Sequence, residues 1–315
     1  MQEAYVRPEV RQFLDYLNNL PNQKAFELPL AEARNMMHAS RHFADAEVGE
    51  LAVIRDFSTE GPGGRLGLRL YDAREVRAPG PLMLFCHGGG FTLGDLDTHE
   101  PFCAEIARLM DLPVVAVDYR LAPEHPFPAA PDDAIAAARW LAESPDELGR
   151  SVTGLVSFGD SAGGNLAIVV ALALRDEPAA VPVIAQWAIY PASEPISHFP
   201  SRDQFEEGFL LSGGSIDWFE QCYRGDEKDW RYAPLLKSQK GMPPSLVVTA
   251  SLDPIRDQGR AYAAACVQAG VRTFYIEAEG TIHGFVNLRR ALPSANEDIR
   301  QSVEALRLLL REASQ

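Results

Sequence analysis

A serine stands between two glycines in the pentapeptide Gly159-Asp-Ser-Ala-Gly163. The pentapeptide follows an apolar run at residues 154–158, which predicts a buried strand, and it opens a helix-length segment at residues 161–175. A serine on such a strand-to-helix turn is exposed as a nucleophile, and the flanking glycines let strand and helix approach closely. The spacing predicts that Ser161 attacks a carbonyl carbon. The alternative is a glycine-rich turn whose serine only caps the helix.

A second glycine-rich segment, His87-Gly-Gly-Gly90, directly follows another apolar run at residues 82–86. Consecutive glycines leave their backbone N–H groups uncovered, and with the N–H of Ala162 these can converge on a developing oxyanion. We therefore expect an oxyanion hole beside Ser161, and the alternative is an ordinary glycine turn. His87 is expected to order this loop rather than to transfer protons. A phosphate site is disfavoured because the sequence has neither a GxGxxG motif nor a P-loop lysine.

A serine hydroxyl needs a base to remove its proton, and the base needs an acid to orient it. With a nucleophile elbow the chain order is serine, acid, histidine, and only His198 and His283 follow Ser161. His283 follows the last predicted strand, whereas His198 has no strand end beneath it, so we choose His283. Asp253 follows the preceding strand and is the expected acid, although an N-cap role is the alternative. Asp257 lies one turn into the next helix and is expected to cap it or to pair with arginine.

Eight short apolar runs predict strands, at residues 51–57, 66–71, 82–86, 113–117, 154–158, 183–190, 245–249 and 272–276. Most lack polar alternation, which is typical of strands buried on both faces of a parallel sheet. Helix-length segments lie between them, at residues 99–110, 131–142, 161–175, 256–269 and 295–311. The alternation predicts a doubly wound α/β sheet with right-handed crossovers.

Two parts of the chain are left over once this sheet is built. Residues 8–20 and 30–43 have apolar positions at helical spacing and precede every strand. Residues 194–229 interrupt the strand–helix alternation and hold nine acidic residues against three basic ones, a net charge of −6. We expect one catalytic domain over residues 1–315, with a cap built from about 1–45 and 194–229. The alternative for the insert is a helical excursion packed on the sheet.

Composition limits the possible partners. The 315 residues are 46% hydrophobic and 23% charged, as in an ordinary folded protein, with a net charge of −15. This charge argues against binding to nucleic acid or to an anionic membrane, and no apolar stretch is long enough to span a bilayer. The four cysteines form no CxxC pair, and residues 1–12 have no apolar signal-peptide core. We expect reduced thiols and a cytoplasmic protein.

The motifs together resemble the hormone-sensitive-lipase-like branch (bacterial family IV) of the α/β-hydrolases. The resemblance rests on five segments: HGGGF at 87–91, DYRLAPEHPFPAA at 118–130, GDSAGGNLA at 159–167, DPIRD at 253–257 and HGF at 283–285. It implies an α/β-hydrolase fold, with a mostly parallel eight-stranded sheet flanked by helices and a helical cap. The implied activity is that of a serine carboxylesterase for short- to medium-chain esters.

The resemblance also assigns residues. It places the nucleophile, acid and base on Ser161, Asp253 and His283, and the oxyanion donors on Gly88, Gly89 and Ala162. It implies a small-molecule ester substrate, no metal and no organic cofactor. In relatives the last strand and helix form a dimer edge, and by analogy the resemblance implies a homodimer. Two small departures, Cys86 before HGGG and Ile255 in place of a frequent leucine, do not touch this chemistry.

Other functions remain open at this point. An amidase, a lactonase or a deacetylase would use the same three residues. A non-catalytic ligand-binding protein or a lyase would keep the scaffold. Loss of one of the three residues is typical of the binding proteins, and all three are present in this sequence.

Overall fold

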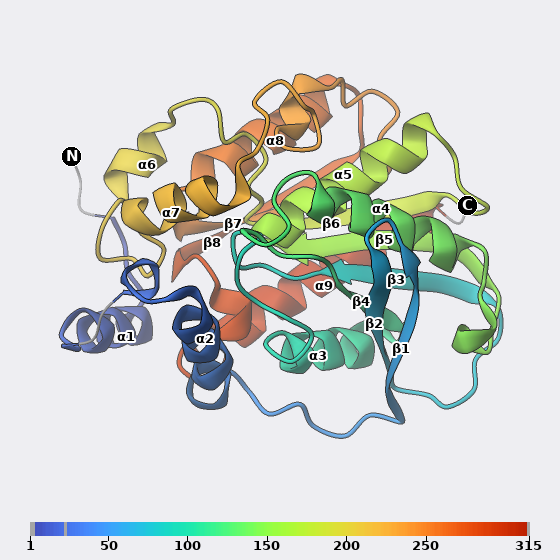
Figure 1. Ribbon diagram of the computed structural model, residues 1–315, viewed down its shortest axis with the longest axis horizontal. Coiled ribbons are helices and arrows are strands. Elements are labelled where there is room, and N and C mark those ends of the chain that lie inside the picture. The colour runs from blue at the N-terminus through green and yellow to red at the C-terminus, as the bar shows by residue number, and fades with distance from the viewer. Residues whose placement is uncertain (1–3, 22–23, 314–315) are drawn as a thin grey trace.

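The computed structural model describes residues 4–21 and 24–313 and has an eight-stranded sheet at its centre (Figure 1). The strand order is β1-β2-β4-β3-β5-β6-β7-β8. Strand β2 pairs antiparallel with β1 and with β4, and all the other neighbours are parallel. The strands are β1 Val53–Gly61, β2 Gly64–Asp72, β3 Gly80–Cys86, β4 Val114–Asp118, β5 Val152–Asp160, β6 Val183–Ile189, β7 Ser245–Leu252 and β8 Thr273–Ile282. The predicted strands and the mostly parallel sheet are thus confirmed.

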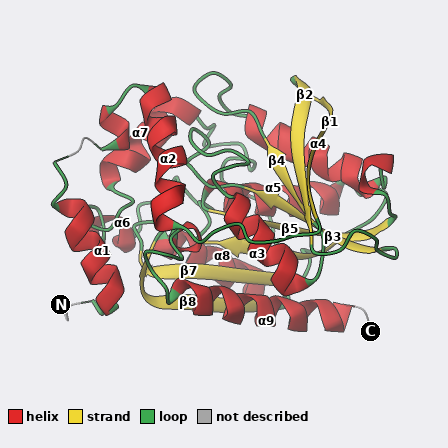
Figure 2. Cartoon of the chain, turned by 90° about the horizontal axis from the view of Figure 1, so that it is seen from below, coloured by secondary structure: helices red, strands yellow, loops and turns green. Residues whose placement is uncertain are grey.

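Helices cover both faces of the sheet (Figures 1 and 2). One face packs against α4 Ala129–Ala142, α5 Ala162–Asp176 and α8 Arg256–Gln268, and the other against α3 Glu100–Met110 and α9 Ala295–Ala313. Helix α5 is apolar from Ala162 to Leu174 apart from Asn165, and all of these residues are buried. A helix with no polar face must lie inside the fold, so the segment after Ser161 is held rigidly against the central strands.

Four further helices gather at one end of the sheet in both views (Figures 1 and 2). They are α1 Pro8–Asn18, α2 Leu30–Ala44, α6 Pro200–Gln204 and α7 Gly213–Tyr223. The segment that carries α1 and α2 contacts the segment that carries α6 and α7. Lys24 pairs with Glu207 at 2.7 Å, and the Asn18 side-chain amide donates to the carbonyl of Gly208 at 3.1 Å. The leftover segments of the sequence therefore form one layer beside the carboxyl ends of the parallel strands.

Short 3₁₀ turns complete the fold: η1 Ala25–Glu27, η2 Asp146–Leu148, η3 Pro234–Leu236 and η4 Phe285–Asn287. Within the described ranges, no helix is both long and apolar enough to cross a membrane.

Candidate active site

Ser161 occupies a strained turn between β5 and α5. Its φ of 57° and ψ of −118° lie in a region that residues with a side chain rarely adopt. The turn is tight because a Cβ on Gly159 would lie 2.3 Å from the carbonyl oxygen of Gly163, and one on Gly163 would lie 1.9 Å from that of Cys86. Only glycine fits at either position. The two glycines of the motif therefore create the sharp turn that projects Ser161.

Three predicted side chains meet at this turn. The Nε2 atom of His283 lies 2.9 Å from Ser161 Oγ, and its Nδ1 atom lies 2.7 Å from Asp253 Oδ2. Asp253 is fully buried and His283 is 8% exposed. The tautomer that satisfies both contacts has its proton on Nδ1, so Nε2 is free to accept the proton of the serine hydroxyl. This arrangement can generate a serine nucleophile.

Strand order explains why residues so distant in the chain converge. Ser161 follows β5, Asp253 follows β7, His283 follows β8, and the glycine loop at residues 87–90 follows β3. All four strands are parallel, so their carboxyl ends open at the same edge of the sheet. Asp253 also accepts the N–H of Ile255 on Oδ1 at 2.8 Å, which holds the loop before α8.

The backbone N–H of Gly88 already has an acceptor inside the protein. This N–H donates to Asp160 Oδ1 at 2.8 Å, and a Cβ on Gly88 would lie 2.4 Å from the other oxygen of the same carboxylate. This hydrogen bond argues against the prediction that Gly88 donates to an oxyanion, because its N–H already has a buried anionic acceptor. No described residue accepts a hydrogen bond from the backbone N–H of Gly89, Gly90 or Ala162. Gly89 and Gly90 have φ of 119° and 60°, which favour glycine.

Asp160 holds this glycine loop from the interior. It is 3% exposed, its Oδ1 lies 3.4 Å from His99 Nε2, and its Oδ2 accepts the Tyr190 hydroxyl at 3.4 Å. Burial alone would raise its pKa, but the attraction of His99 and of the other nearby histidines outweighs burial and lowers the pKa. Asp160 is therefore an ionised carboxylate that fixes the loop.

His87 is buried beneath the same loop. Its Nδ1 lies 2.8 Å from the carbonyl oxygen of Gly88, and its ring stacks on Tyr119 with centroids 4.2 Å apart. Burial, with a smaller contribution from His99, lowers the pKa of His87 to about 4. The ring is neutral near pH 7, as expected for a residue that orders the loop.

The other candidate residues, His198 and Asp257, do not contact Ser161, His283 or Asp253. His198 is exposed and pairs with Asp203 at 2.9 Å. Asp257 pairs with Arg256 at 2.9 Å and with Arg260 at 3.1 Å, so its predicted pairing with arginine is confirmed. It also accepts the N–H of Ser201 in α6 at 3.0 Å, which the sequence did not indicate.

Helix α7 supplies contacts that sequence reasoning missed. A Cβ on Gly90 would lie 2.2 to 2.5 Å from ring atoms of Phe219, so this ring rests directly on the glycine loop. One turn further along, Tyr223 stacks on Phe91 with centroids 3.9 Å apart and an interplanar angle of 7°. The insert has no recognisable motif. Its aromatic residues were the only feature of the sequence that could have indicated these contacts.

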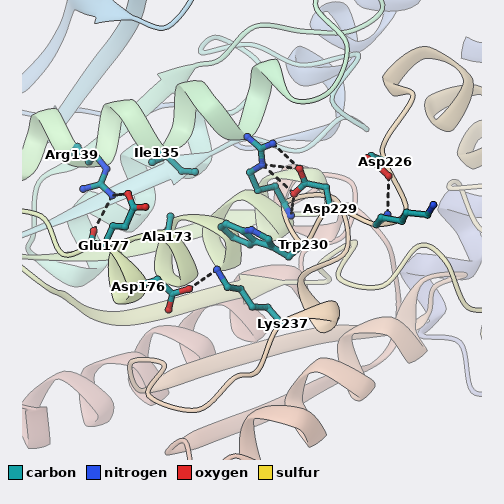
Figure 3. A pocket seen from close by; sticks show the side chains of 11 residues that line it. Ile135, Arg139, Ala173, Asp176, Glu177, Asp226, Asp229, Trp230 and Lys237 are labelled. Carbon is teal, nitrogen blue, oxygen red and sulfur yellow. Dashed lines mark hydrogen bonds and ion pairs between the residues drawn. The ribbon is translucent and has the colours of Figure 1, made fainter.

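A cavity of about 600 Å³ lies elsewhere, between α4, α5 and residues 226–237 (Figure 3). It is lined by Ala173 and Asp176 near the end of α5, whereas Ser161 precedes the start of that helix. Three ion pairs border it: Asp176–Lys237, Arg139–Glu177 and Arg231–Asp229. This cavity is separate from the serine site. The described residues contain no group of three or more His, Cys, Asp or Glu side chains that could hold a metal ion.

The sheet order and the sharp turn at Ser161 between β5 and α5 are those of the α/β hydrolases. A family model described as the α/β hydrolase fold matches residues 83–287, and the chain belongs to this family. The resemblance drawn from the motifs is thereby confirmed.

Individual relatives cover most of the chain. It is 40% identical over 264 residues to the carboxylic ester hydrolase LipN of Mycobacterium tuberculosis, covering 81% of this chain and 70% of LipN. It is 36% identical over 282 residues to the ethyl acetate hydrolase of Pseudomonas putida, covering 87% and 89%. The solved structure of a thermostable esterase from Pseudomonas putida superposes with a TM-score of 0.90 at 28% identity, covering 98% of this chain and 99% of the esterase.

Proposed function

We propose that this protein is a serine carboxylesterase that hydrolyses short- to medium-chain carboxylic esters through an acyl-enzyme. The observation that carries the proposal is the chain of contacts from Asp253 through His283 to Ser161, at 2.7 and 2.9 Å. The names of its relatives as carboxylic ester hydrolases and esterases support the same class. A non-catalytic binding protein would have no need of this contact.

The proposed reaction begins with attack of Ser161 Oγ on the ester carbonyl, while His283 Nε2 takes the hydroxyl proton. Asp253 holds the imidazole and stabilises its charged form. The alcohol leaves with a proton from His283, which then activates a water that releases the acid and restores the serine. All proton transfers use one histidine, and no step calls for a metal or a cofactor.

The oxyanion of the tetrahedral intermediate is assigned to the N–H groups of Gly89, Gly90 and Ala162. Gly90 takes the place first predicted for Gly88, because the Gly88 N–H is bound to Asp160. Loss of one such donor typically costs roughly 3–4 kcal/mol of transition-state stabilisation.

The proposed cap consists of about residues 1–45 and of residues 194–229, within a single catalytic domain over 1–315. Two contacts of residues 194–229 support this proposal. Phe219 rests on Gly90, and a Cβ on Gly284, beside His283, would lie 3.9 Å from the side chain of Leu210. Apolar side chains at these places favour a neutral ester of modest size, and the insert's net charge of −6 disfavours an anionic one.

The proposed location is the cytoplasm, supported by four cysteines that are all free thiols, three of them buried. A homodimer through β8 is also proposed, because β8 is an edge strand whose Tyr275 is 40% exposed. Sedimentation of the wild type and of Tyr275→Arg tests the dimer, and a wild-type monomer at micromolar concentration would contradict it.

A substrate panel tests the activity itself. Esters, an anilide and lactones that share a four-carbon acyl group are offered to the purified protein at matched concentration. The proposal predicts the highest kcat/KM for the esters. A higher kcat/KM for the anilide or for a lactone would move the assignment to an amidase or a lactonase.

A further inference from the structure

One side chain of α2 contacts residues just beyond the glycine loop. Arg34 in α2 donates from Nε to the carbonyl of Thr92 at 3.0 Å and from Nη2 to the carbonyl of Ala122 at 3.0 Å. Glu124 accepts from Nη1 and Nη2 at 2.7 and 2.8 Å, and these hydrogen bonds lower its pKa. The guanidinium is planar with donors in fixed directions, so these three acceptors hold it in one orientation.

The two carbonyls that Arg34 holds belong to residues that hold the glycine turn. Thr92 donates its N–H to the carbonyl of Gly89 at 3.1 Å and its hydroxyl to the carbonyl of Gly90 at 3.1 Å. Ala122 donates its N–H to the carbonyl of Phe91 at 2.8 Å. Every carbonyl from residue 89 to 91 is therefore bound to a residue that Arg34 itself contacts.

Helix α2 also contacts the chain beyond the glycine loop, at Asp97. His38 lies 3.4 Å from a carboxylate oxygen of Asp97, and Arg41 donates to the backbone carbonyl of Asp97. Positions 34, 38 and 41 fall on one face of a helix. The glycine loop is thus held from the interior by Asp160 and from the cap by α2.

We propose that Arg34 is a positioning residue for the oxyanion hole, setting the N–H groups of Gly89 and Gly90 through the carbonyls of Thr92 and Ala122. The inference rests on the proposed function. Catalysis by fixed donors depends on their placement, and a misplacement of about 1 Å can cost roughly 100-fold in rate. Helix α2 then positions the oxyanion donors in addition to its proposed role in the cap.

The test compares Arg34→Lys with Arg11→Lys, a matched control at an exposed position of α1. Lysine keeps the charge but cannot reach two carbonyls and a carboxylate together. For p-nitrophenyl butyrate we expect kcat per titrated active site to fall roughly 10- to 100-fold in Arg34→Lys with KM nearly unchanged. The inhibition constant of a trifluoromethyl ketone, whose adduct carries an oxyanion, should rise by a similar factor. Arg11→Lys should behave as wild type.

Glu124→Gln gives a second measurement that leaves Arg34 in place. It removes the charge that orients the guanidinium, so we expect a smaller fall in kcat in the same direction. The inference is overturned if Arg34→Lys lowers only the thermal midpoint, or raises only KM, with kcat per active site unchanged. A wild type that hydrolyses no ester and binds no trifluoromethyl ketone would instead refute the proposed function.

Discussion

At the scale of single residues, the carboxylate of Asp160 has the most unusual position. It stands beside Ser161 in the sequence, and it accepts the N–H of Gly88. Its negative charge is retained in the interior because His99 and other histidines surround it. The residue next to Ser161 therefore shapes the glycine loop through its hydrogen bond with Gly88.

Replacement of Asp160 tests this role. Asp160→Ala leaves the Gly88 N–H buried without an acceptor, which costs about 1–3 kcal/mol of folding stability. We expect a lower thermal midpoint and a lower kcat, whereas Asp160→Asn, which keeps an acceptor oxygen, should lose less of both. The measurements are thermal unfolding and ester hydrolysis. Wild-type kcat in a folded Asp160→Ala protein would show that the loop does not depend on this carboxylate.

Activity should also depend on pH through His283. Protonation of His283 removes the base, so kcat/KM should fall as the solution becomes acidic. The pKa of His87 is lowered to about 4 by burial, so this ring stays neutral at any pH well above 4. We expect His87→Asn to leave the pH midpoint of the acidic fall unchanged, whatever it does to the maximal rate. A flat profile down to about pH 4, the range of a free carboxylate, would contradict a histidine base.

Residue-level prediction from the sequence worked where chain order and strand ends restrict the choice. Ser161, Asp253 and His283 each follow a strand, and the structure brings them together. The donors of the glycine loop were harder to predict, because three consecutive glycines look alike in the sequence. Which N–H groups are free depends on the backbone angles at Gly89 and Gly90 and on the acceptor Asp160, and neither is visible in a sequence.

At the scale of elements, α7 lies directly on the glycine loop. Its Phe219 ring contacts Gly90 and its Tyr223 ring stacks on Phe91, so the helix and the loop form one surface. The sequence predicted the amphipathic helix α2 because its apolar positions repeat at helical spacing. It did not resolve α6 or α7. Helix α6 has only five residues and is held by tertiary contacts such as that of Ser201 with Asp257. Helix α7 begins with two consecutive glycines, Gly213 and Gly214, which are weak helix formers.

Shortening Phe219 should change substrate size preference. Phe219→Ala removes a ring that fills the space next to Gly90, so longer acyl or alcohol groups gain room. We expect the ratio of kcat/KM for longer over shorter p-nitrophenyl or alkyl esters to rise. Phe26→Ala is the matched control, since Phe26 lies against Gly214 of α7 rather than against the glycine loop. An unchanged ratio in both the acyl and the alcohol series would remove Phe219 as a determinant of size.

At the scale of the whole molecule, the sheet was the most predictable feature, since buried parallel strands are continuous apolar runs. The largest difference is in the length of β8, which was predicted to end at residue 276 and is observed to continue to Ile282. Residues 277–281 are mostly polar or glycine, and β8 has a neighbour on one side only. An edge strand does not need the continuous apolar run from which the strands were predicted.

The whole fold should lose stability in acid. Asp97, Asp160, Asp176 and Asp257 all have a lowered pKa in the folded state, that of Asp176 to about 2 through hydrogen bonds from Arg175 and Lys237. The unfolded chain binds protons on these groups more readily, so their stabilisation is complete above about pH 4 and is lost toward pH 2. Thermal midpoints should therefore be similar at about pH 7 and 5 and lower at about pH 3. A midpoint at pH 3 equal to that at pH 5 would contradict this.

The most direct test of the central claim is reaction of Ser161 with a fluorophosphonate, read by intact mass beside hydrolysis of p-nitrophenyl butyrate. We predict that the wild type gains one phosphonyl group on Ser161 and loses activity in proportion. Ser161→Ala should gain none and should hydrolyse no ester, while its circular dichroism and thermal midpoint stay close to those of the wild type. Near-normal turnover in Ser161→Ala, or labelling of a different residue with loss of activity, would contradict the account.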